Sequence, residues 1–372
     1  MPTDAGIQDL LVFWLVVAGR FFLPLFIPRF PLPAILACLV LDALDQTLFQ
    51  TFTDLDLSGY QGYDKALDIY YLTVAYLSTL RNWANRDAFQ VARFLFYYRL
   101  AGVVLFELLH WRALLLVCPN TFEYFFIVYE AIRLRWDPKR LTRRNVILLA
   151  AAIWVLIKLP QEYWIHIAKL DTTDLISAHR WVGILAAAVI LALVAVLRRV
   201  VWPRVPQPDY AWRVSADPIP AEIADAAQRD AWIARHRKLF DWRMLEKIVL
   251  VGFVCVIFAQ ILPEVDASNV EIFIGTAVLI TIDSLLGLWT ARRSRGVTST
   301  IQAFVWLALA NGAVVFVGEA FDGEDELPLG NLLFFVLLLT LIVTLYDRYE
   351  PFHGVRFQDG AARQTPRLAR IG

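Results

Sequence analysis

Eight ionisable side chains lie in or beside long apolar stretches of the 372-residue sequence, where an unpaired charge is unfavourable. Carboxylates in such surroundings bind protons or cations, and basic side chains there hold anionic groups. We therefore predict that these residues line a cavity for a substrate or a proton. They are Asp42, Asp45, Asp68, Arg99, Glu107, Glu123, Lys158 and Glu162.

Two pairs among these candidates have a specific chemical interpretation. Asp42 and Asp45 are three residues apart, so they share one face of a helix, and their mutual repulsion raises the affinity for a proton or cation. The alternative is that a short helix lets both aspartates reach the outer membrane interface. Arg99 and Glu123 have the same predicted depth on neighbouring helices, which favours a buried ion pair.

Proline residues lie next to the charges in two of the apolar stretches. Pro119 precedes Glu123, and Pro160 lies between Lys158 and Glu162. Proline removes a backbone hydrogen-bond donor and kinks a helix, and unwound backbone inside a membrane is tolerated only beside protein or water. The sequence therefore predicts two helix breaks close to the candidate cavity.

Metal binding is a further possibility for four residues. Glu107 and His110 have the Glu-x-x-His spacing of carboxylate-bridged metal sites, and Glu162 and His166 are one helical turn apart. Such a site needs two Glu-x-x-His motifs with additional glutamates, and the sequence has one. We expect no metal and no cofactor. The three cysteines form no CxxC pair, and no phosphate-binding loop, hydrolase triad or HExxH motif is present.

The composition indicates the class of protein. The chain is 59% hydrophobic and only 19% charged, with a mean hydropathy of +0.55, which is typical of a membrane protein. About 11 stretches are long enough to cross a bilayer, so we predict an all-α polytopic integral membrane protein. These stretches are roughly 7–28, 33–50, 66–82, 89–109, 112–133, 146–167, 181–202, 246–263, 270–290, 298–318 and 330–346.

The basic residues predict the orientation. Basic loops such as 133–144 and 198–247 alternate with acidic loops such as 54–64 and 322–326. Because basic loops stay on the cytoplasmic side, we expect the N-terminus outside and the C-terminus in the cytoplasm. The excess of arginine over lysine, together with the alanine and leucine content, suggests a bacterial genome. We therefore expect a multi-pass protein of the plasma membrane, namely the bacterial inner membrane.

The predicted domain organisation has four parts. They are a polar-cavity membrane bundle of about seven helices at 1–202, a cytoplasmic linker at 203–245, an apolar scaffold of about four helices at 246–350 and a basic tail at 351–372. The second half of the linker is helical by propensity. It places Ile223, Ala226, Ile233 and Phe240 near one face, which we expect to lie on the membrane surface. In the scaffold, Asp283 and Asn311 are expected to form interhelical hydrogen bonds.

Three functions remain open. The first is proton-coupled transport of a small polar solute through an outward-facing charged cavity. The second is an enzyme that acts on a lipid or lipid-linked substrate at the outer leaflet, with Asp42, Asp45, Glu107 or Glu162 as acid or base. The third is a non-catalytic assembly or sensor subunit. The expected partners are the lipid bilayer and either a small polar solute or a lipid head group, but no nucleic acid; the sequence leaves the oligomeric state and the substrate open.

Overall fold

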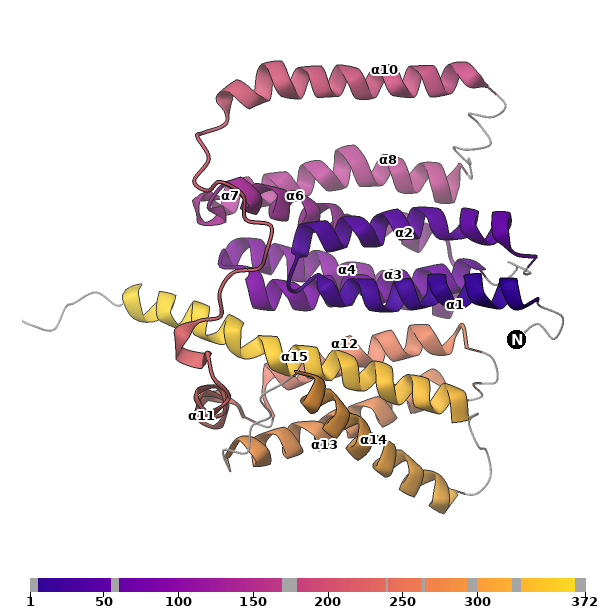
Figure 1. The fold of residues 1–372 in the computed structure, drawn as a ribbon, viewed down its shortest axis with the longest axis vertical. Helices are drawn as coiled ribbons and strands as arrows, with labels where there is room; N and C mark the ends of the chain where they lie inside the picture. Colours follow the sequence, from indigo (N-terminus) through magenta and orange to yellow (C-terminus); the bar gives the residue numbers. More distant parts are fainter. Residues whose placement is uncertain are drawn as a thin grey trace, which may run out of the picture.

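The computed structural model describes residues 6–54, 60–168, 179–238, 240–262, 265, 267–292, 300–322 and 329–364. The helices of this part run roughly side by side across Figure 1. The longer helices are α1 (Ile7–Phe22), α2 (Pro31–Phe52), α3 (Tyr60–Asn82), α4 (Arg86–Leu109), α6 (Thr121–Arg135), α7 (Arg143–Ala152), α10 (Arg180–Val196), α11 (Ala226–His236), α12 (Trp242–Ala259), α13 (Asn269–Arg292), α14 (Thr300–Asp322) and α15 (Leu329–Gln364).

Seven helical stretches in the described part are long and apolar enough to cross a membrane. They are Ile7–Phe26, Pro31–Phe52, Ala113–Arg135, Arg143–Ile165, Trp181–Arg204, Asn269–Arg292 and Gly330–Phe357. The all-helical prediction is therefore confirmed for the described residues, whereas the number of such stretches is smaller than predicted. The other predicted spans also form helices, as α3, α4, α12 and α14, but they are more polar or shorter.

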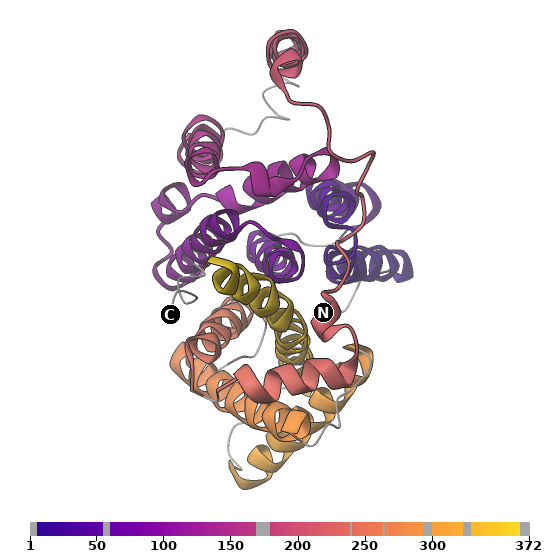
Figure 2. The same cartoon turned by 90° about the vertical axis from the view of Figure 1, so that its left-hand side faces the viewer.

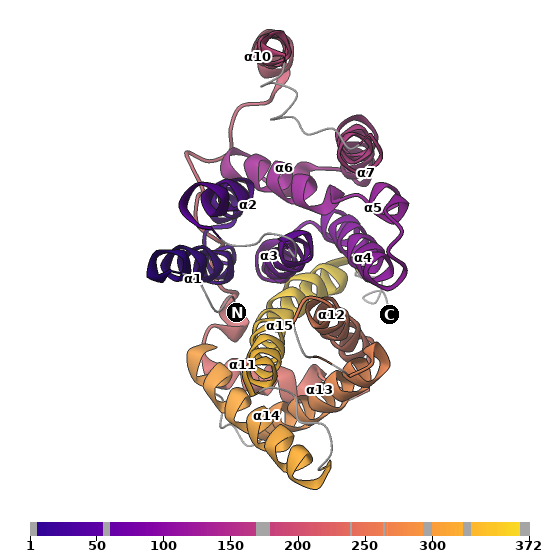
Figure 3. The same cartoon turned by 90° about the vertical axis from the view of Figure 1, so that its right-hand side faces the viewer.

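Helix α3 lies in the centre of the molecule, with α1, α2, α4, α6, α12 and α15 around it (Figure 3). Its side chains between Ala66 and Leu80 are buried, apart from that of Asp68, which is partly buried. Tyr76 of α3 stacks on Phe96 of α4 with ring centroids 4.6 Å apart. Because neighbouring helices cover α3, its polar residues face protein, which explains why a helix of low hydropathy occupies this position.

The two prolines act differently. The fifth span is broken at Pro119, between α5 (Ala113–Val117) and α6, as predicted. The sixth span continues past Pro160, because π-helical turns η3 (Ile153–Lys158) and η4 (Tyr163–Ile167) flank the short α8 (Leu159–Glu162). Both spans therefore have irregular backbone beside charged residues. π-Helical turns of this kind are frequent at functional sites.

The proline-rich segment 205–220, which we call the strap, crosses one end of the bundle without helical structure. Its backbone N–H groups at Asp209 and Tyr210 donate to the carbonyl of Arg135 at 2.9 and 3.1 Å. The N–H of Ala216 donates to the carbonyl of Arg29 at 2.8 Å. The strap is therefore held by backbone hydrogen bonds to α6 and to the chain that follows α1. We call this end, which faces the viewer in Figure 2, the strap end.

Helix α11 lies across the strap end (Figures 1 and 2), preceded by the 3-10 turn η7 (Ala221–Ile223). The sequence favoured a membrane surface for its apolar face, but the structure packs this face on protein. Trp232 and Ile233 form a buried cluster with residues of α13 and α15. Phe240 is not on this face: α11 ends at His236, and Phe240 is 80% exposed.

We predict that Gly354→Ala loosens α11. A Cβ atom at Gly354 would lie 2.5 Å from the ring of Trp232, so the helix must move, at a cost of about 1–3 kcal/mol in the free energy of unfolding. Hydrogen exchange of the α11 amides in purified protein should become faster. Gly287→Ala on α13 is the control, because its Cβ meets open space. Equal exchange in both variants would contradict this packing.

Candidate functional site

Arg20 of α1 lies at the centre of four aspartates from α2 and α3. Its side chain is only 2% exposed. Its guanidinium nitrogens lie 2.6 Å from an oxygen of Asp42, 3.3 Å from Asp64 and 3.1 Å from Asp68. It also forms an ion pair with Asp45, whose side chain is fully buried. We call these five residues the Arg20 cluster.

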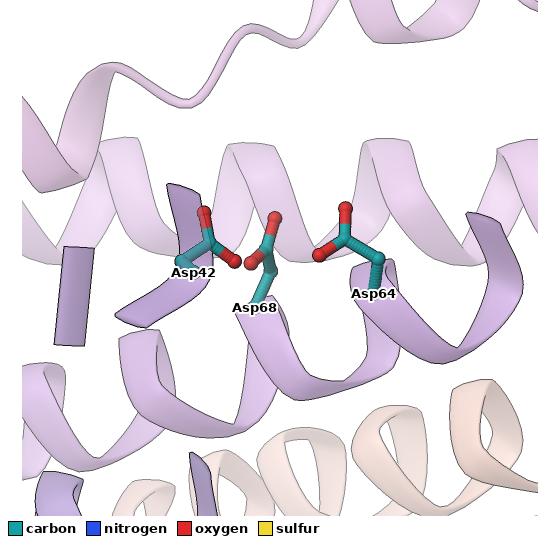
Figure 4. A group of neighbouring side chains, drawn as sticks. All are labelled: Asp42, Asp64 and Asp68. Carbon is teal, nitrogen blue, oxygen red and sulfur yellow. The ribbon is translucent and has the colours of Figure 1, made fainter. Parts of the chain in front are cut away.

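The spacing of the aspartates explains how two helices can surround one arginine. Asp42 and Asp45 are three residues apart on α2, and Asp64 and Asp68 are four apart on α3, so each pair shares a helix face. In Figure 4 the carboxylates of Asp42 and Asp68 lie next to each other, and Asp64 follows on the neighbouring turn of α3. The structure therefore brings together three of the predicted residues, Asp42, Asp45 and Asp68.

The Arg20 cluster has too little positive charge for its carboxylates. One guanidinium faces four carboxyl groups, and ligand oxygens of Asp42, Asp64 and Asp68 lie within 4.8 Å of one another. Several ionised carboxylates this close in a buried site repel strongly, so a proton or a cation has to compensate them. The side chains of Asp64, Asp42 and Asp68 are 32%, 23% and 20% exposed, which leaves a route by which protons can reach them.

Two tyrosines of α3 complete the surroundings of the Arg20 cluster. The hydroxyl of Tyr60 donates to Asp45. The hydroxyl of Tyr63 is buried and has no hydrogen-bond partner among the described residues. A phenol can donate to an ionised carboxylate and accept from a protonated one, so these hydroxyls can follow a change in protonation.

A second polar group surrounds Glu123, at the break between α5 and α6. Glu123 is buried and accepts hydrogen bonds from the hydroxyl of Tyr71 at 2.6 Å and from the side-chain amide of Asn120 at 2.9 Å. The backbone N–H of Asn120 donates to Glu162 at 3.3 Å. The break at Pro119 therefore supplies donors for two carboxylates. Because Tyr71 lies one turn after Asp68 on α3, one face of this helix links the two polar groups.

Lys158 and Arg99 are buried beside Glu123, but Arg99 does not form the predicted ion pair with Glu123. The ammonium of Lys158 donates to the side chain of Gln161 at 3.1 Å and lies 4.0 Å from the ring centroid of Tyr124. Arg99 donates to the carbonyl of Cys118 at 3.1 Å. No direct ion pair joins Arg99 to Glu123 within the described residues. Arg99 and Glu123 have the same predicted depth in the membrane, but depth does not show how each helix is rotated about its axis. That rotation decides whether the two side chains meet.

The remaining candidates lie apart from these groups. Glu107 is half-buried near Lys65, and His110 ends α4 as an exposed residue with a φ of 54°. The side chain of His166 lies outside the described residues. Among the described residues, the one group of three side chains with a spacing suited to a metal ion is Asp42, Asp64 and Asp68, rather than Glu107 with His110 or Glu162 with His166.

Sequence reasoning missed two members of the Arg20 cluster. Arg20 is the single charge between Asp9 and Arg29 in the first apolar stretch, and this isolation was the available signal. The sequence pattern places Asp64 in an acidic outer loop, but α3 begins at Tyr60 and includes it.

Other buried polar and charged residues connect helices in the later part of the chain. The predicted hydrogen bonds of the scaffold are present: Asn311 donates to Asp283 at 3.1 Å and to Thr340 at 3.0 Å. Arg237, which follows α11, pairs with Asp347 at 3.0 Å. Burial opposes the charge of Arg237, but the carboxylates of Asp347 and Glu350 raise its pKa. We regard these contacts as structural.

No protein-family model, curated protein or solved structure matches this chain.

We predict that Arg20→Gln destabilises the folded protein by about 3–5 kcal/mol, because it leaves buried carboxylates without their partner. Arg140→Gln is the control: the Arg140 side chain is 60% exposed and pairs with Asp209 at 2.5 Å, so its loss should change stability by at most about 1 kcal/mol. Unfolding of both variants in detergent measures the difference. Similar stabilities would show that Arg20 does not hold α1, α2 and α3 together.

Proposed function

We propose that this protein is a multi-pass membrane transporter that couples the movement of a small polar solute to protons. The Arg20 cluster is its proton-binding site. The observation that carries this proposal is the surplus of carboxyl groups around one buried guanidinium. Proton uptake lowers the repulsion within the cluster, and proton release restores it, so the arrangement of α1, α2 and α3 responds to protonation.

The proposal includes the membrane topology. We infer that α3, α4, α12 and α14 also cross the bilayer, which gives about 11 crossings in the plasma membrane of a bacterium, with the N-terminus outside. The central position of α3 supports this, because its neighbours shield its polar residues from lipid. The basic residues Lys139, Arg140, Arg143 and Arg144 lie near the strap end, which is then cytoplasmic. Asp64 and Asp68, near the start of α3, are then in the outer half of the membrane.

The group around Glu123 is the solute site in this proposal. Lys158 and Arg99 offer positive charge, and Glu123, Glu162 and Asn120 offer hydrogen-bonding groups. Discontinuous helices form the substrate sites of many transporters, and the break at Asn120 and the turn at Lys158 have this character. Tyr71, which bonds to Glu123 and follows Asp68 on α3, connects solute binding to the proton site.

A divalent cation is the alternative occupant of the Arg20 cluster. Ligand oxygens of Asp42, Asp64 and Asp68 lie within 4.8 Å of one another. This spacing favours a bound cation, since carboxylates are the usual ligands of Mg²⁺ and Ca²⁺. A bound cation at this depth would favour an enzyme acting on a lipid-linked substrate at the outer leaflet. If Mg²⁺ or Ca²⁺ raises the melting temperature of the wild type but not of Asp64→Asn, this alternative gains.

We predict that Asp68→Asn abolishes solute-driven proton uptake. The protein is placed in liposomes that contain a pH-sensitive dye, and amino acids, sugars and polyols are tested in turn. Asp42→Asn should have the same effect, because both carboxylates belong to the shared proton site. Asp54→Asn, an exposed aspartate outside the cluster, is the control and should keep wild-type uptake. Transport that proceeds unchanged in Asp68→Asn, or that needs no pH gradient, would contradict proton coupling through this cluster.

A further inference from the structure

The strap end holds a cavity of about 580 Å³, which lies in the range of pockets that bind small molecules. The residues that follow α1, the end of α3, the strap, the start of α14 and the last part of α15 form its walls. Segments far apart in the sequence therefore close it. Leu25, Pro28, Ile219 and Phe352 supply an apolar part of the lining.

Three arginines, Arg29, Arg81 and Arg348, line this cavity. None of them forms an ion pair with the residues that the structure describes. Arg81 donates to the side chain of Asn82 at 2.6 Å and to the backbone carbonyl of Asp217 at 3.4 Å, which are neutral acceptors. Arg348 is partly buried and has no hydrogen-bond acceptor in the described part of the chain. A guanidinium has five N–H donors, so most donors of these three arginines have no acceptor among the described residues.

The carboxylate in the described lining acts electrostatically on Arg81, but it forms its ion pairs with two other arginines. It belongs to Asp217, which pairs with Arg133 at 3.1 Å and with Arg213 at 3.0 Å. Positive charge is therefore in excess around the cavity. On the nearby α11, burial and then the guanidinium of Arg348 lower the pKa of Arg229, while Asp230 and Asp225 oppose this shift. An anion inside the cavity would supply the missing counter-charge.

We propose that this cavity binds a phosphate-bearing anion, recognised by Arg29, Arg81 and Arg348. The planar guanidinium fork matches the oxygens of a phosphate group, and such hydrogen bonds are among the strong ones in proteins. The apolar lining accommodates the organic part of the ligand. The cavity lies where the first span ends, at the level of the lipid head groups on the predicted cytoplasmic side. The phosphate therefore belongs either to an anionic lipid or to a soluble phosphate compound.

Binding adds polar contacts between parts of the chain that lie far apart in the sequence. Arg29 follows α1, Arg81 belongs to α3 and Arg348 to α15, and the strap covers the cavity with residues Ser215 to Ile219. A ligand that bridges these arginines ties the strap and α15 to the amino-terminal helices. Because the unfolded chain lacks the cavity, the ligand should raise the melting temperature.

The test compares melting temperatures of the purified full-length chain with two probes. The first is inorganic phosphate added to protein in neutral detergent. The second compares nanodiscs of phosphatidylcholine alone with nanodiscs that also contain phosphatidylglycerol. We expect at least one probe to stabilise the wild type. Arg348→Gln should weaken that response at least about tenfold in apparent affinity, as for the loss of a charge-assisted hydrogen bond.

Arg235→Gln is the matched control, since Arg235 is exposed on α11 at the same end and bonds only to the carbonyl of Ala231 in the described chain. It should keep the wild-type response. A response to phosphate identifies a soluble compound as the source, and a response restricted to phosphatidylglycerol identifies a lipid. Arg348 has no hydrogen-bond or ion-pair partner among the described residues, so Arg348→Gln should fold. Arg29→Gln is the second variant. The proposal is overturned if neither probe stabilises the wild type, or if Arg348→Gln and Arg29→Gln respond as the wild type does.

Discussion

The ion pairs of Arg20 are the interaction on which the arrangement of the first three helices depends. A guanidinium inside a membrane protein needs negative partners, and α2 and α3 supply four. The attraction joins α1 to both neighbours, but the same carboxylates repel one another. We propose that protons or a cation balance the charge of the cluster, which links its structure to its chemistry.

Helix α3 connects the Arg20 cluster to the polar group around Glu123. It presents Asp64 and Asp68 to Arg20 and Tyr71 to Glu123, and its central position keeps these polar side chains away from lipid. The broken backbone at Asn120 then extends the polar group to Glu162. These buried charged residues are held by ion pairs and by hydrogen bonds from neutral donors, which is how a membrane interior tolerates them. The strap end is different, because the arginines that line its cavity form no ion pair with the residues that the structure describes.

The sequence predicted the helical fold and part of the site, for identifiable reasons. Long apolar stretches reveal helices, and a spacing of three residues puts Asp42 and Asp45 on one face whatever the surroundings. The partner of these aspartates could not be predicted, because Arg20 lies in another helix whose rotation depends on packing. The expected pair of Arg99 and Glu123 failed for the same reason. The apolar face of α11 was recognised, but its periodicity does not tell whether protein or lipid covers it.

The central claim is that the Arg20 cluster holds a proton inside the membrane at neutral pH. Infrared difference spectroscopy of the purified protein between neutral and alkaline pH tests it directly, because protonated and ionised carboxyl groups absorb at different frequencies. We expect a protonated carboxyl band at neutral pH that disappears at alkaline pH and that is lost or shifted in Asp42→Asn and Asp68→Asn. A wild-type spectrum without that band, or a band that both substitutions leave unchanged, would contradict the claim.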